Sequence, residues 1–247
     1  MNELIKNSYD INIKKIYKDF FYYMNEKIKI IKLKEIPINI NNKINILKDK
    51  RISQIVLTKN KEYFTKYKNE YIILLKINDL DNNIDLEYIN IFNIENNLEE
   101  KNIIEEYEKQ IDELESKIKE IHKDYYIGLA EISISILNNN IGLKESAIGH
   151  NISFDKISKE ELNNPLNFIK IDKMYNMANY IKYKFFNDEL NIEELKQIIK
   201  KIKNEKEYKR FIAHMLYPNY YFESNDKEKV IKKHKKYEKM ILMITEK

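Results

Sequence analysis

The spacing of apolar residues changes along this chain from a strand pattern to a helix pattern. In the first 77 residues, short stretches such as Ile28–Ile30 and Ile36–Ile40 alternate apolar and polar side chains, which is typical of half-buried strands. From Ile104 onward, apolar residues recur every three or four positions, which is typical of helices that bury one face. A half made of short strands followed by a helical half favours the α+β class.

The first half contains enough apolar segments for a small antiparallel sheet. The run at residues 71–75 is its longest continuous apolar stretch, so we expect it to form the central strand. The loop at residues 78–83 predicts a boundary between two lobes. Turn-like Lys and Asn residues separate the predicted elements, which are a helix at 11–24, strands at 28–30 and 36–40, and a three-strand meander at 52–58, 62–66 and 70–77.

The second half contains several amphipathic helices. Apolar residues spaced 3, 4, 3, 4 and 3 apart predict a helix over residues 104–121. Asn191 followed by Glu194 is typical of a capping box that opens a helix, and Pro218 is expected to end another. The other predicted helices lie at residues 125–137, 208–216 and 230–244.

Glycine is scarce in this sequence. The chain has three glycines in 247 residues, all between Gly128 and Gly149, where average usage would give roughly 17. Glycine-rich phosphate-binding loops are therefore excluded from both halves. Cysteine is absent, which excludes disulfides, thiol nucleophiles and cysteine-ligated zinc.

The charge of the chain is nearly balanced. The chain has 44 Lys and Arg and 40 Asp and Glu, which gives a formal net charge of +4. Because nucleic-acid-binding domains are usually strongly basic, a nucleic-acid partner is not expected. The sequence has neither the apolar run of a signal peptide nor one long enough for a membrane span, and we expect a cytoplasmic protein. The dominance of Ile, Tyr, Lys and Asn indicates an AT-rich bacterial coding sequence.

The segment from residue 125 to 222 carries a resemblance to a known family. It contains Gly149-His150-Asn151, a predicted strand ending in Asp172, and a helix start at Asn176-Met177-Ala178. This order resembles the C-terminal lobe of the aminoglycoside-phosphotransferase-like kinases. Among these it is most similar to the spore-coat-associated, kinase-fold proteins of endospore-forming bacteria, to which the late segment 216–222 is also similar.

The resemblance covers most of residues 52–222 and implies a kinase-like fold of two lobes. A small, reduced antiparallel sheet lobe is expected at residues 1–80. A larger helical lobe is expected at residues 81–247.

Several positions depart from the family's catalytic pattern. His150 matches the first residue of the catalytic loop, but the Asp expected two residues later is Ile152. The metal-binding Asn expected about seven residues after the His is Ile157, whereas Asp172 matches the metal-binding Asp at the end of the strand. Asn176 replaces the Asp of the helix start. Phosphoryl transfer needs metal ligands and a group that orients the attacking hydroxyl, so the resemblance implies a catalytically degenerate kinase, a pseudokinase.

The candidate site residues also have structural interpretations. Asp172 is either a residual metal ligand or a polar residue that ends a strand and caps a helix. His150 is a weak catalytic candidate, or an imidazole bonded to loop backbone. Asp155 could replace the missing acid if the loop were remodelled.

Three functional hypotheses remain open. The first is a degenerate kinase-fold protein that binds or assembles with another protein, in the cytoplasm, the mother cell or the spore coat, with no cofactor. The second is an active small-molecule phosphotransferase that uses ATP and Mg²⁺, with Asp172 for metal and Asp155 as base. The third is a helical adaptor that binds an anionic membrane or nucleic-acid surface through a C-terminal lysine stripe, which consists of Lys227, Lys229, Lys232, Lys233, Lys235, Lys236 and Lys239.

Overall fold

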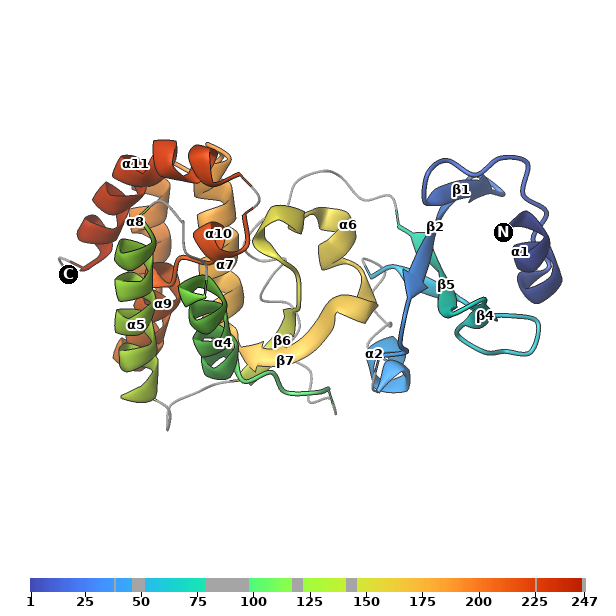
Figure 1. Ribbon diagram of the computed structural model, residues 1–247, viewed down its shortest axis with the longest axis horizontal. Coiled ribbons are helices and arrows are strands. Elements are labelled where there is room, and N and C mark those ends of the chain that lie inside the picture. The colour runs from blue at the N-terminus through green and yellow to red at the C-terminus, as the bar shows by residue number, and fades with distance from the viewer. Residues whose placement is uncertain are drawn as a thin grey trace. The chain divides into compact units, whose positions relative to one another are not determined.

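The computed structural model describes residues 1–37, 39–45, 52–78, 98–116, 122–140, 146–224 and 226–245, without the side chains of residues 44, 45, 155 and 244. The chain forms two compact units (Figure 1). Of the described residues, the first unit holds those up to 78, together with 98–99 and 158–168, and the second holds the rest. A small antiparallel sheet and a helical region confirm the predicted α+β class. The predicted boundary near residue 80 borders residues 79–97, which lie outside the described residues, so it stays a prediction.

The first unit is built on the antiparallel sheet. The strand order is β1-β2-β5-β3, and β4 pairs with β5 as well. Its elements are α1 (Asn2–Tyr9), β1 (Phe20–Tyr23), β2 (Glu26–Leu33), α2 (Ile40–Asn45), β3 (Gln54–Val56), β4 (Thr65–Tyr67), β5 (Glu70–Ile77), α6 (Lys159–Leu162) and η3 (Pro165–Asn167).

Strand β5 is central, as predicted. Its residues 72–75 are fully buried, and one edge of the strand pairs with β2 along its length while the other edge pairs with β3 and β4. The predicted meander is wrong. Val56 pairs with Leu74 and Thr65 with Ile72, so β3 and β4 follow one another along the same edge of β5 instead of pairing with each other.

Two other predictions for this unit are wrong. Residues 11–24 form an irregular segment and β1 instead of a helix, because Lys18, Met24 and Asn25 adopt positive φ angles that belong to turns. The helix lies earlier, at α1, where Tyr9 donates a hydrogen bond to the carbonyl of Ile72 at 3.0 Å. The second predicted strand, at 36–40, is also absent from its described residues, since α2 begins at Ile40.

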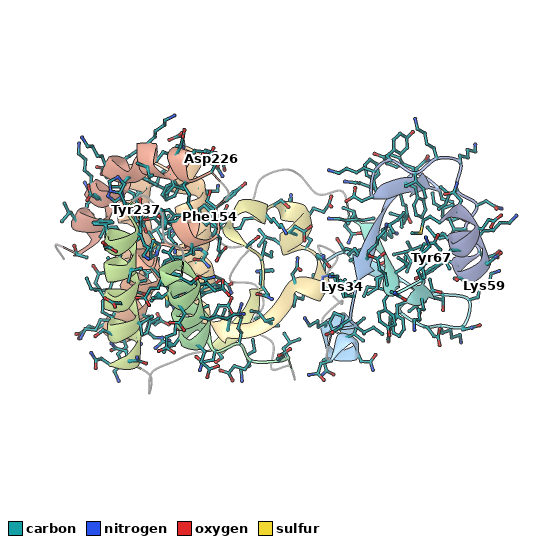
Figure 2. The ribbon with its side chains drawn as sticks, viewed as in Figure 1. Lys34, Lys59, Tyr67, Phe154, Asp226 and Tyr237 are labelled. Atoms are coloured by element: carbon teal, nitrogen blue, oxygen red, sulfur yellow. The ribbon has the colours of Figure 1, made fainter. Side chains whose placement is uncertain are left out.

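The two faces of β2 contact different parts of the unit. Ile28 and Ile30 point to a buried cluster shared with α1, against which Tyr67 also packs (Figure 2). The alternate residue Lys29 points to the other face, where its ammonium lies 2.6 Å from Glu160 and 2.8 Å from Glu161. The segment 158–168 therefore belongs to this unit although it follows residues 100–157 of the other.

The second unit is a set of helices around α9, with a two-stranded sheet of β6 and β7. Helix α9 contacts α5, α7 and α11, and its residues 210–216 are all buried, as expected of a helix inside a bundle. The elements are α4 (Ile103–Glu115), α5 (Lys123–Asn138), β6 (Ser146–His150), η2 (Phe154–Lys156), β7 (Phe168–Asp172), α7 (Lys173–Phe186), α8 (Ile192–Lys201), α9 (Glu205–Leu216), α10 (Asn219–Phe222) and α11 (Lys227–Thr245).

The helix predictions for this unit are largely confirmed. The capping box of Asn191 and Glu194 opens α8, and α9 ends two residues before Pro218. Helix α4 has the predicted apolar stripe and ends at Glu115, and the remainder of its predicted range, 117–121, lies outside the described residues. Aromatic side chains fill the interior, among them Phe154 and Tyr237 (Figure 2). Within the described part of the chain, no helix is long and apolar enough to cross a bilayer.

Candidate functional site

The junction of β7 and α7 holds the carboxylate predicted from the sequence. Asp172 is the last residue of β7 and the N-cap of α7, where its Oδ1 accepts a hydrogen bond from the amide of Met174 at 2.8 Å. Such a cap satisfies one of the amides that a helix start leaves without an intrahelical partner.

The other carboxylate oxygen of Asp172 contacts two side chains from α9. Arg210 Nε donates a hydrogen bond to Oδ2 at 2.5 Å, and its Nη2 forms an ion pair with the same oxygen. His214 Nε2 lies 3.2 Å from Oδ2. Asp172 is 1% exposed and Arg210 3%, so the pair lies inside the protein.

The charge states in this cluster follow from burial and from its neighbours. Burial acts to raise the pKa of Asp172, but His214 and Arg210 outweigh it and hold that pKa below its ordinary value. Burial lowers the pKa of His214, so the imidazole is neutral at neutral pH. Arg210 is then the cation that balances the carboxylate, while His214 Nδ1 lies 3.1 Å from the hydroxyl of Tyr107.

A second buried cation lies at the end of α9. Lys182 on α7 is fully buried, and its ammonium donates hydrogen bonds to the carbonyls of His214 at 2.8 Å and Tyr217 at 2.9 Å. These are carbonyls of the last turn, where the helix dipole favours a cation. Burial nevertheless lowers the pKa of Lys182 to about 7.

His150 and the residues around it pack against the first turns of α7. His150 is the last residue of β6 and is 5% exposed, and its backbone amide donates to Asn176 Oδ1 at 3.4 Å. Asn176 Nδ2 donates to the carbonyl of Ile148 at 3.3 Å. A Cβ on Gly149 would overlap Asn176 and Ile171, so glycine is required here for close approach of β6 to α7. Asp172 and His150 are thus both tied to the start of α7.

The remaining predicted positions are not in this cluster of hydrogen bonds. Ile157 is a buried core residue and Ile152 is partly exposed. Asp155 belongs to η2, but its side chain lies outside the described part of the structure. Among the described residues, no group of three His, Asp or Glu side chains is placed to hold a metal ion.

Three lysines of the C-terminal stripe make contacts within the second unit. Lys233 and Lys236 each lie 2.8 Å from a carboxylate oxygen of Asp188, and Lys227 donates to the carbonyl of Tyr221. These side chains are tied to α10 and to the end of α7. The adaptor hypothesis stays a prediction that depends on the other four lysines of the stripe.

Sequence reasoning missed Arg210 and Lys182. Arg210 lies 38 positions from Asp172, so nothing local connects them. The sequence carried one signal for them, which is that each basic residue lies next to an apolar residue of its helix. Arg210 precedes Phe211 and Lys182 follows Ile181, and both apolar residues are buried. A charge on an apolar helix face indicates a buried partner.

Comparisons with known proteins identify the fold. No family model and no curated protein matches the sequence. An aminoglycoside phosphotransferase from Alicyclobacillus acidocaldarius is similar in structure, with a TM-score of 0.69 and 9% identity over 100% of this chain and 96% of that one. The AMP-bound complex of a spectinomycin phosphotransferase gives a TM-score of 0.55 and 11% identity over 98% and 96%. The chain therefore has the kinase-like fold of the aminoglycoside phosphotransferases.

Proposed function

We propose that this chain is a kinase-fold protein with degenerate phosphotransfer machinery, and that it acts by binding another protein. The kinase-like fold is the first support for this proposal. Two substitutions support degeneracy, because Ile152 and Ile157 stand where the family resemblance places a carboxylate and an amide. Neither isoleucine can bind a metal or orient a hydroxyl.

The observation that carries the proposal is the environment of Asp172. In an active kinase of this kind the matching carboxylate would hold Mg²⁺, an ion that usually keeps several waters and takes one or two carboxylates plus substrate phosphates. Here Asp172 is 1% exposed, one oxygen caps α7 and the other contacts Arg210 and His214. The guanidinium already neutralises the carboxylate, so these surroundings do not fit a hydrated divalent cation. Asp172 is better explained as a structural residue that joins β7 to α9.

His150 also fits a structural role. It follows Gly149, whose missing side chain allows β6 to approach α7, and its amide is held by Asn176. The resemblance places Asp at the position of Asn176, and the amide can both donate and accept, which it does toward the backbone of two β6 residues. This packing of His150 does not require a catalytic role for its side chain.

An assay of phosphotransfer tests the proposal. The purified chain is incubated with Mg²⁺ and ATP, with and without aminoglycosides, and ADP formation is followed beside two variants. Asp172→Asn changes the buried carboxylate, and Asp188→Asn changes an exposed one. We expect the same background rate in all three proteins. ADP formation that falls in Asp172→Asn and persists in Asp188→Asn would establish the alternative, an active phosphotransferase.

The family resemblance also suggests where a non-catalytic protein would act. We propose a partner in the spore coat or its assembly, with the chain located in the mother cell or the coat and with no cofactor. Immunoblots of coat extracts and of vegetative lysates from the source bacterium test this localisation. Detection only in vegetative cells would remove the sporulation role and leave the degenerate-kinase proposal standing.

A further inference from the structure

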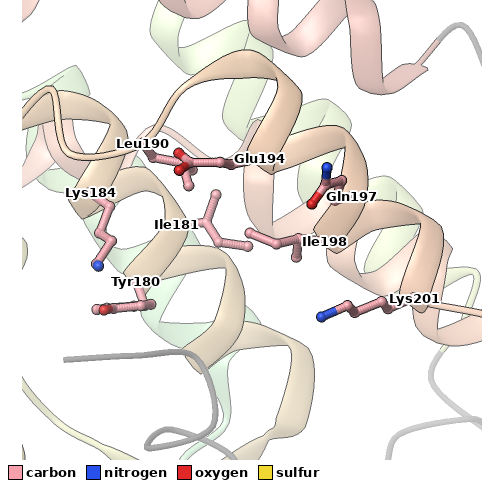
Figure 3. A pocket seen from close by; sticks show the side chains of 8 residues that line it. All are labelled: Tyr180, Ile181, Lys184, Leu190, Glu194, Gln197, Ile198 and Lys201. Atoms are coloured by element: carbon pink, nitrogen blue, oxygen red, sulfur yellow. The ribbon is translucent and has the colours of Figure 1, made fainter. Parts of the chain in front are cut away.

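A groove of about 240 Å³ lies between α7 and α8, inside the second unit, and Asp172 is not among the residues that line it (Figure 3). Ile181 from α7 and Ile198 from α8 meet across it, and the ring of Tyr180 forms part of its wall. Tyr180 is 3% exposed and Ile181 1%, so these side chains belong to the core and form a fixed apolar surface.

Charged groups are separated along this groove. Glu194 lies beside Leu190 at one end, and its carboxylate is held in place because Asn191 donates its backbone amide to it at 2.9 Å. In Figure 3, the ammonium groups of Lys184 and Lys201 lie on opposite sides of the isoleucine pair, Lys184 beside Tyr180 and Lys201 beyond Ile198. The carboxylate of Glu194 is therefore bonded within the capping box, and the two lysines flank the apolar floor of the groove.

The two lysines of the groove are not neutralised by nearby carboxylates. Lys184 lies over the ring of Tyr180, 5.3 Å from its centroid, and no carboxylate in the described ranges is paired with Lys184 or Lys201. Neighbouring lysines differ, since Lys173 and Lys196 are each 2.9 Å from a glutamate. The groove thus combines an apolar floor with two flanking lysines, neither of which forms an ion pair with a described carboxylate.

We propose that this groove binds a small molecule with one aromatic or branched apolar body and one anionic group, either a carboxylate or a phosphate. The body would cover Ile181 and Ile198, and the anionic group would lie between Lys184 and Lys201. At about 30 Å³ per water, the volume corresponds to roughly eight waters, which suits a single ring with one substituent. This proposal is independent of the proposed loss of phosphotransfer.

Fluorine NMR of three probes tests the site and distinguishes the two anionic groups. The probes are 4-fluorobenzoate, 4-fluorophenyl phosphate and the uncharged 4-fluorobenzamide, each titrated with the full chain. We expect saturable binding of at least one anionic probe, with the amide much weaker. Lys184→Gln and Lys201→Gln should each weaken that binding about two- to fivefold, and the double variant about tenfold.

Two control variants test whether the probes bind in this groove. Lys200→Gln removes a neighbouring exposed charge that does not line the groove, and it should leave binding unchanged. Ile198→Trp should block all three probes, because the larger side chain would fill the groove. Equal binding of acid and amide, unchanged affinity in the double lysine variant, or a wild-type dissociation constant weaker than about 10 mM would each overturn the proposal.

Discussion

Arg210 donates a hydrogen bond to Asp172 at 2.5 Å, and this contact joins the end of β7 and the start of α7 to the buried face of α9. Arg210 also donates from Nη1 to the carbonyl of Asn140, just after α5, at 2.9 Å. One guanidinium therefore connects three helices of the second unit. Its partner is the residue that the family resemblance assigns to metal binding.

Replacing Arg210 with Met should destabilise the chain by about 3–5 kcal/mol, because the substitution leaves Asp172 buried without its cation. Lys209→Met is the matched control. Lys209 is 52% exposed and pairs with Glu205 on the surface, so its loss should cost less than about 1 kcal/mol. Urea unfolding followed by circular dichroism measures both. Similar losses of unfolding free energy in the two variants would show that the buried carboxylate of Asp172 does not need the charge of Arg210.

Lys182 should make the free energy of unfolding change with pH above about pH 7. Its pKa is about 7 in the folded chain and 10.5 in the unfolded chain, so between these values the unfolded state binds a proton that the folded state lacks. The free energy of unfolding should then rise with pH, by up to about 1.4 kcal/mol per unit from this group. Lys182→Met should remove that slope between pH 7 and 9.

The comparison of the two proteins removes the contributions of groups that do not interact with Lys182. Burial also lowers the pKa of Lys43, which contributes with the same sign in both proteins and cancels. Buried tyrosines act with the opposite sign only near and above pH 10, outside the measured window. Urea midpoints at half-unit pH steps give the slopes. Parallel curves for wild type and Lys182→Met would mean that the buried lysine keeps its ordinary pKa.

The two described glycines should respond in opposite directions to alanine. Gly149→Ala should cost about 1–3 kcal/mol, since the new methyl group overlaps Asn176 and Ile171. Gly128→Ala should stabilise by about 0.5–1 kcal/mol, because Gly128 lies within α5 and nothing lies within 4 Å of its added Cβ. Thermal unfolding compares them directly. A neutral Gly149→Ala would show that β6 can move away from α7.

Lys29 should hold the segment 158–168 against the sheet. Its ammonium contacts both Glu160 and Glu161, and the same segment accepts a hydrogen bond from the amide of Ser53 through Asn163 at 3.0 Å. Lys29→Gln should speed hydrogen exchange at the Ser53 amide several-fold, because the segment opens more often. Lys32→Gln, on the opposite face of β2, should leave that amide unchanged. Equal exchange rates of the Ser53 amide in the two variants would show that contacts other than those of Lys29 hold the segment 158–168 against the sheet.

Local patterns predicted the elements that local forces determine. The capping box of Asn191 and Glu194, the apolar stripe of α4 and the continuous run of β5 each lie within a few residues, and the structure confirms them. The predicted helix at 11–24 is wrong. Its apolar spacing fits a helix, but Lys18 and Met24 adopt the positive φ angles of turns, which interrupt a helix. Those turns are not glycines, so the sequence carried little signal for them.

The candidate site depends on contacts between distant residues. The sequence placed Asp172 at the end of a strand, which the structure confirms, but α7 begins at Lys173, three residues before the predicted helix start at Asn176, because Asp172 caps the helix. It did not predict Arg210, His214 or Lys182 as neighbours, because the packing of α7 on α9 brings them together. The interpretation of Asp172 therefore depended on tertiary structure that no spacing rule supplies.

The measurement that tests the central claim most directly is the thermal stability of the chain with ATP, with and without Mg²⁺. Ligand bound at 100 times its dissociation constant would stabilise the fold by about 2.7 kcal/mol, which is readily detected. Because Asp172 is already paired with Arg210, we predict no Mg²⁺-dependent rise in melting temperature at about 5 mM nucleotide. A rise that requires Mg²⁺ and disappears in Asp172→Asn, but persists in Asp188→Asn, would contradict the account.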